Sequence, residues 1–203
     1  MIITPLRAMK QIVSALRKED CQFCLIGGHA ASLYRSQERF TKDVDFALVA
    51  SPPDKSRLVA ARAIKAIGLT PVMGFIPPGP GERTRKSVCM VTSSPSEGSL
   101  TGLVDILLPE VPWVQVAVER SQANMIDLGF ATVPVITPED LIVAKSYSVR
   151  NSPDRFQDLD DLKELLTNVK ELDLDYIRRR LAEFSLVIPE QVRKFAAPSL
   201  RNL

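Results

Sequence analysis

The sequence predicts an α/β fold in two parts. Residues 1–136 are expected to form a mixed β-sheet core with flanking helices, and residues 137–203 a helical region packed on that core. In the first part, short apolar runs that end in glycines or polar turns alternate with amphipathic segments. From Thr137 onward the periodicity is helical throughout. A chain of 203 residues is long enough to bury a core without disulfides or metal staples.

The composition narrows the class of protein. Hydrophobic residues make up 45% and charged residues 25%, which excludes collagen-like, coiled-coil and disordered chains. The net charge of +2 does not indicate a general nucleic-acid binder, although it leaves room for a local basic site. No apolar run approaches the roughly 18 residues of a membrane span. Because three cysteines also favour a reducing compartment, we expect a cytoplasmic protein without a membrane partner.

The N-terminal segment predicts an amphipathic helix. Thr4 is a capping residue, and Pro5 stands at the first helical position. Apolar residues then recur at helical spacing and form one face: Leu6, Met9, Ile12, Val13 and Leu16.

A strand, a glycine pair, a helix and a second strand follow. Residues 22–26 form a short apolar run that ends at Gly27 and Gly28, residues 29–36 predict a short helix, and residues 42–49 predict a strand. Two glycines allow close approach of the backbone to a ligand, and unpaired N–H groups at a helix start attract anions. A tight strand-to-helix turn with no ligand explains the same glycines.

The remaining elements continue this alternation. Residues 56–68 predict a helix ended by Gly68, and strands are expected at residues 69–75, 86–92 and 102–108. Residues 111–122 predict a helix, and residues 125–136 a hairpin that turns near Gly129. Four further helices are expected at residues 137–150, 154–166, 174–184 and 189–196.

Three acidic residues lie in predicted strands. Asp43 and Asp45 alternate with Val44, so both carboxylates project from one face of their strand. Asp105 interrupts the apolar run GLVDILL. Adjacent carboxylates repel each other unless a cation neutralises them, and oxygen ligands favour Mg²⁺ or Mn²⁺ over zinc. The three acids together match a two-metal phosphoryl-transfer site. A solvated strand face and a hydrogen-bonded structural aspartate are the alternatives.

At this point the sequence resembles a known superfamily. The segment LIGGHAASLYRSQERFTKDVDFAL resembles the nucleotidyltransferase signature, which is a glycine turn and helix followed by Asp-x-Asp. The spacing of Arg39, Thr41, Asp43 and Asp45 is similar to that of the AbiEii-type nucleotidyltransferases, a group that includes toxins of type IV toxin–antitoxin systems. The segment VPVITPEDLIVAKSYSVRNSPDRFQDLDDLKELL is similar to the helical part of that group, and the resemblance spans about residues 20 to 166.

The resemblance implies a role for each of these positions. Asp43, Asp45 and Asp105 would be the catalytic, metal-binding acids, and Asp105 would also help to deprotonate the acceptor. Gly27, Gly28, Arg39, Thr41 and Lys145 would bind the nucleotide and its phosphates. The expected reaction is metal-dependent transfer of an NMP group from an NTP to an acceptor hydroxyl, with Mg²⁺ or Mn²⁺ as cofactor. The acceptor would be the 3′ end of a tRNA or a protein, and a cognate antitoxin the partner.

Two alternatives remain open. A degenerate member of the superfamily would bind nucleotide or a partner protein without catalysis. The acidic group Asp158, Asp160 and Asp161 is either a solvated helix face or a set that orients Lys145 or Arg150. Helical spacing puts Asp158 and Asp161 on one face and Asp160 off it.

Overall fold

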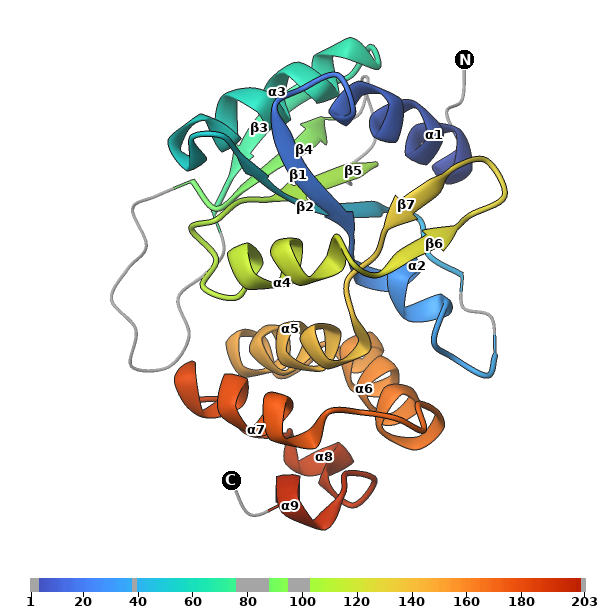
Figure 1. Cartoon of the computed structure of the whole chain (residues 1–203), viewed down its shortest axis with the longest axis vertical. Helices are drawn as coiled ribbons and strands as arrows, with labels where there is room; N and C mark the ends of the chain where they lie inside the picture. The colour runs from blue at the N-terminus through green and yellow to red at the C-terminus, as the bar shows by residue number, and fades with distance from the viewer. Residues whose placement is uncertain (1–3, 38–39, 76–87, 95–102, 202–203) are drawn as a thin grey trace. The chain divides into compact units, whose positions relative to one another are not determined.

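The computed structural model describes residues 4–37, 40–75, 88–94 and 103–201, and these residues form two compact units (Figure 1). The first unit contains residues 4–29, 40–75, 88–94 and 103–136. The second contains residues 30–37 and 137–201. Helix α2 (Gly27–Ser32) begins in the first unit and ends in the second.

A five-stranded mixed sheet is the centre of the first unit, which confirms the predicted fold class. The strands, in the order β1-β2-β5-β4-β3, are β1 (Cys21–Leu25), β2 (Val44–Ala50), β5 (Val104–Leu107), β4 (Met90–Ser94) and β3 (Thr70–Gly74). Among the strands that the structure describes in this sheet, β2 and β5 are the one parallel pair of neighbours. These two adjacent strands contain Asp45 and Asp105.

Helices cover both faces of this sheet. Figure 1 shows α1 (Pro5–Leu16) and α3 (Ser56–Ala66) on one side and α4 (Val114–Ser121) on the other. The short 3₁₀ helix η1 (Pro53–Lys55) leads into α3. Phe46, Leu48 and Ile106 are fully buried. Ala47 is buried on the opposite face, so the middle of β2 is buried on both faces, which explains why its apolar run does not alternate strictly with polar residues.

The N-terminal helix matches the prediction except at Leu6. The Thr4 hydroxyl accepts a hydrogen bond from the Arg7 amide and caps the helix. Leu6 is 55% exposed, whereas Ala8 and Ala15 are buried. The buried face of the helix is thus centred nearer to the two alanines than predicted. Because an α-helix turns by about 100° per residue, Leu6 lies at the edge of this face.

A β-hairpin ends the first unit, as predicted. It consists of β6 (Met125–Asp127) and β7 (Thr132–Pro134), and Gly129 in its turn has a φ of +77°. Val135 then pairs with Leu25 in a parallel bridge, so the chain leaves the sheet directly beside the end of β1.

The second unit is helical. Its long helices are α5 (Pro138–Asn151), α6 (Phe156–Asn168) and α7 (Leu174–Glu183), followed by the short helices α8 (Glu190–Arg193) and α9 (Pro198–Arg201). The first four match the predicted segments, and α9 is additional. Helix α5 contacts both α6 and α7, and the Tyr176 hydroxyl donates a 2.5 Å hydrogen bond to Asp140. Within the described residues, no helix is both long and apolar enough to cross a membrane.

Candidate functional site

Two of the predicted acids lie side by side because of the strand register. Asp45 on β2 is the direct partner of Asp105 on the parallel strand β5. Partners at one register position project from the same face of a sheet. Asp43 precedes β2 by one residue, and Asp43, Asp45 and Asp105 are all partly exposed.

Asp105 lies in an environment that opposes its negative charge. Burial raises the pKa of the Asp105 carboxyl, a hydrogen bond from Thr92 lowers it, and the charge of Asp43 raises it again, with a net upward shift. Its Oδ1 atom is buried and has no hydrogen-bond partner among the described residues. A bound cation would satisfy this oxygen and offset the repulsion between the acids.

The acids fit a divalent cation in donor chemistry and in charge. Carboxylate oxygens are the ligands that Mg²⁺ and Mn²⁺ prefer. In the part of the chain that the structure describes, no three Asp, Glu, His or Cys side chains are grouped as a complete metal-ligand set. Metal binding by Asp43, Asp45 and Asp105 therefore stays a prediction.

The raised pKa of Asp105 predicts a pH-dependent gain in stability on its removal. The folded protein binds this proton more tightly than the unfolded chain, so ionised Asp105 opposes folding at neutral pH. Without divalent metal, Asp105→Asn is expected to raise the melting temperature at pH 7. The gain should shrink as the pH falls toward the ordinary carboxyl pKa of 3.8 and vanish below it, where both states are protonated.

Circular dichroism melts between pH 4 and pH 8, roughly the span over which a shifted carboxyl titrates, check this expectation. The exposed Asp54 provides a control of equal charge change, and Asp54→Asn should leave the curve unchanged. An Asp105→Asn protein that melts below the wild type at pH 7 would contradict the expectation.

Gly27 is required at the start of α2 for two independent reasons. Its φ of +67° lies in the left-handed region, where side chains are strained. A Cβ atom at this position would lie 2.0 Å from Oδ2 of Asp45. The glycine therefore allows the backbone to approach the Asp45 carboxylate, so the glycine turn and the acidic strand form one local arrangement.

Gly27→Ala is expected to lower nucleotidyl transfer by about 100-fold, because the new methyl group displaces the Asp45 carboxylate. The left-handed backbone adds a stability cost of about 1–2 kcal/mol. Gly68→Ala separates the two effects: its φ is +80°, but no heavy atom lies within 4 Å of the added Cβ. Transfer assays on both variants check the prediction, which fails if the two lose equal activity.

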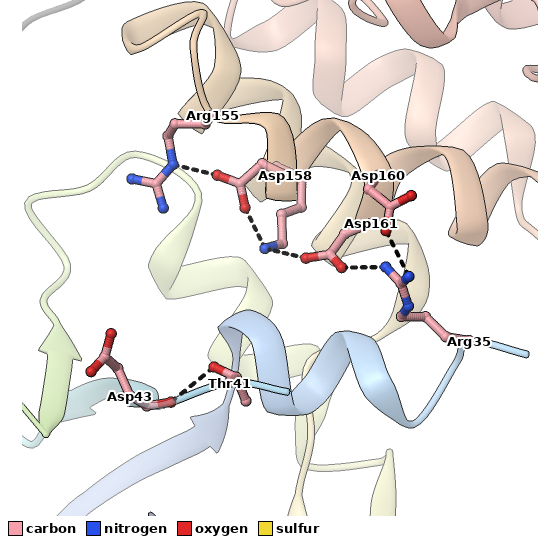
Figure 2. Close-up of polar contacts among 8 residues, drawn as sticks. Arg35, Thr41, Asp43, Arg155, Asp158, Asp160 and Asp161 are labelled. Carbon is pink, nitrogen blue, oxygen red and sulfur yellow. Dashed lines mark hydrogen bonds and ion pairs between the residues drawn. The ribbon is translucent and has the colours of Figure 1, made fainter. Parts of the chain in front are cut away.

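The structure places two of three other predicted nucleotide-binding residues, Gly28 and Thr41. Gly28 is buried in the first turn of α2. The Thr41 hydroxyl donates a 3.4 Å hydrogen bond to the backbone carbonyl of Asp43, as Figure 2 shows, and so braces the segment that enters β2. Arg39 lies outside the described residues.

Lys145 on α5 is buried and held by two carboxylates of α6. Its ammonium nitrogen lies 2.5 Å from Oδ1 of Asp158 and 2.8 Å from Oδ2 of Asp161 (Figure 2). Both aspartates are buried, so the solvated-face alternative is wrong for them, and they contact Lys145 as their spacing predicts. An ammonium group has three N–H donors, and these two contacts leave one available for a further acceptor.

Two arginines complete this cluster within the second unit. Arg155 donates from Nε to the other oxygen of Asp158 at 2.5 Å. Arg35, in the turn after α2, uses one guanidinium nitrogen on Asp161 and the other on Asp160, both at 2.7 Å. Asp160 is half exposed, unlike its two buried neighbours. Among the described residues, these contacts join three cations to three carboxylates.

Sequence reasoning did not find Thr92, Arg35 or Arg155. Thr92 reaches Asp105 only because β4 pairs with β5, and the pairing of two strands cannot be read from either strand alone. Arg35 lies 126 residues before Asp161. Arg155 had a local signal, because it precedes Asp158 by three residues, a spacing that allows ion pairs on a helix.

The chain matches a known protein family. A family model described as "Nucleotidyl transferase AbiEii toxin, Type IV TA system" matches residues 11–196. No curated protein matches the chain significantly.

Solved structures of similar fold share little sequence with the chain. The solution structure of the antibiotic-resistance factor ANT(2'')-Ia has a TM-score of 0.53 at 14% identity, over 88% of this chain and 89% of that one. An antigenic nucleotidyltransferase-like protein from Paracoccidioides brasiliensis has a TM-score of 0.48 at 16% identity, over 87% and 86% of the two chains. The likeness to ANT(2'')-Ia shows a shared fold. The family match spans most of the 203 residues, and the chain therefore belongs to the AbiEii nucleotidyltransferase toxin family.

Proposed function

We propose that this protein transfers an NMP group from an NTP to an acceptor hydroxyl, with release of pyrophosphate, and that the reaction depends on Mg²⁺ or Mn²⁺. The main support is the pairing of Asp45 with Asp105 on adjacent parallel strands, where the buried Oδ1 of Asp105 lacks a hydrogen-bond partner among the described residues. Paired carboxylates with an unsatisfied buried oxygen match the acidic, metal-binding site of enzymes that transfer phosphoryl groups with the help of metal ions.

Asp43, Asp45 and Asp105 would hold the divalent cation. When bound, the metal neutralises charge on the phosphates and on the leaving pyrophosphate. The protein contributes the rest of the site. Asp105, whose pKa is raised, is suited to accept the proton of the attacking hydroxyl, since a base works best when its pKa lies closer to the working pH.

Other residues would bind the nucleotide. Gly27 and Gly28 would bind the triphosphate through the backbone of this turn, because a glycine has no side chain of its own between its N–H group and a ligand. The remaining N–H donor of Lys145 would bind a phosphate oxygen, and the two aspartates that hold Lys145 would fix its direction. Arg39 and Thr41 would support the acidic segment or bind phosphate.

The acceptor we propose is the 3′ end of a tRNA or a protein hydroxyl, and the biological role is that of the toxin in a type IV toxin–antitoxin pair. The family description supports this role, because it names both the transferase and the toxin–antitoxin system. A cognate antitoxin is the implied partner.

Incubation of the purified protein with each α-³²P-labelled NTP, Mg²⁺ and either total tRNA or cell lysate tests the proposal. Label is expected to appear in RNA or in protein, and EDTA should prevent it. Label in RNA or in protein identifies the acceptor class. Metal-dependent nucleotide binding without transfer to RNA, protein or small molecules would overturn the proposal and favour a binding protein without catalysis.

A further inference from the structure

Arg35 is the more buried of the two arginines in the ion-pair cluster. Its side chain is 8% exposed, whereas that of Arg155 is 59% exposed. It lies in the turn after α2, and the next residue, Ser36, donates a 3.1 Å hydrogen bond to Glu164 of α6. Arg35 and Ser36 thus both attach this turn to α6, and these contacts hold the backbone at Arg35 in place.

The guanidinium group acts on a carboxylate that is shared. Arg35 Nη1 binds Oδ1 of Asp161, and the second oxygen of that carboxylate binds Lys145. Arg35 Nη2 binds Asp160 at the same time. A planar guanidinium that spans two carboxylates fixes the rotation of both.

Lys145 depends on this fixed carboxylate for its position. Its stem has four rotatable bonds, and the ammonium is a point charge without directional preference of its own. The oxygens of Asp158 and Asp161 therefore determine where the remaining N–H points. If Asp161 rotates, Lys145 keeps one holding contact in place of two.

We propose that Arg35 is a positioning residue of the transferase, which orients Lys145 toward the nucleotide phosphates through Asp161 without contacting the nucleotide. The proposal rests on the phosphate-binding role proposed for Lys145. It adds a residue outside the glycine turn and the acidic strand to the machinery, and it predicts that nucleotide affinity depends on an arginine that does not contact the nucleotide.

A double-mutant cycle on nucleotide affinity tests this inference. The dissociation constant for a non-hydrolysable NTP is measured by calorimetry with Mg²⁺, on full-length proteins that circular dichroism shows to be folded at the working temperature. Lys145→Met is expected to weaken binding by about 10-fold, the value of one modest charge-assisted hydrogen bond. Arg35→Gln should weaken binding by several-fold in the wild type and should have no effect when Lys145 is already Met.

Two further variants keep the result interpretable. Arg35→Lys keeps the positive charge but loses the planar guanidinium with its two donating nitrogens. This variant should fold as the wild type does and show part of the loss in nucleotide affinity. Arg62→Gln removes another arginine–carboxylate pair, with Glu19 in the first unit, and should leave affinity unchanged.

The outcomes separate this inference from the proposed function. If Lys145→Met binds NTP as tightly as the wild type, the role of Lys145 is wrong and the inference fails with it. If Lys145→Met weakens binding but Arg35→Gln does not, or does so equally in both backgrounds, only the inference fails. Loss of the Arg35→Gln effect in the Lys145→Met background supports it.

Discussion

Asp45→Asn is expected to abolish nucleotidyl transfer and to leave the fold intact. Asn has the shape of Asp without its charge, so the contact with the backbone at Gly27 is kept while the paired carboxylates Asp45 and Asp105 lose one member. Removal of one of two adjacent negative charges also relieves repulsion. We expect a rate loss of about 1000-fold or more, the scale seen when a group that stabilises transition-state charge is removed, and an unchanged or higher melting temperature.

The measurement is the labelled-NTP transfer assay together with a thermal melt of the same preparation. Asp54→Asn removes the same charge from an exposed position in η1 and should transfer label at the wild-type rate. Wild-type turnover by Asp45→Asn would show that the acidic strand is not the catalytic one. An unfolded Asp45→Asn protein would contradict the expectation that the fold stays intact.

Asp161→Ala is expected to lower the free energy of unfolding by about 3–5 kcal/mol. Asp161 is completely buried, and its two oxygens bind Arg35 and Lys145, which are themselves buried. Its removal leaves two buried cations short of a counter-charge, and this is the costly way to break an ion pair. Denaturant unfolding followed by circular dichroism measures the change.

The adjacent residue supplies a matched control. Asp160 binds the same Arg35, but its side chain is half exposed, so Asp160→Ala should cost less than about 1 kcal/mol. Equal losses for the two variants would mean that burial does not determine the strength of this cluster.

The local patterns in the sequence were sufficient for most elements of the fold. Thr4 and Pro5 predict the start of α1, Gly129 predicts the hairpin turn, and the apolar runs predict the strands. These signals act between residues that are close in the sequence, so local backbone preferences are enough to produce the elements. Leu6 is the exception, because the centre of a buried helix face depends on what packs against it.

In the candidate site, too, some features follow from local sequence patterns and others from contacts between distant segments. Local sequence patterns predicted that Asp45 lies on a strand, that glycines precede it, and that Asp158 and Asp161 share a helix face, whereas Asp43, predicted on the same strand, lies one residue before it. The parallel pairing of β2 with β5, which brings Asp105 beside Asp45, and the contact of Arg35 with Asp161 are visible only in the folded chain. Strand pairing and ion pairs between distant segments depend on the burial of the whole chain, because the charges meet only after apolar surfaces have packed.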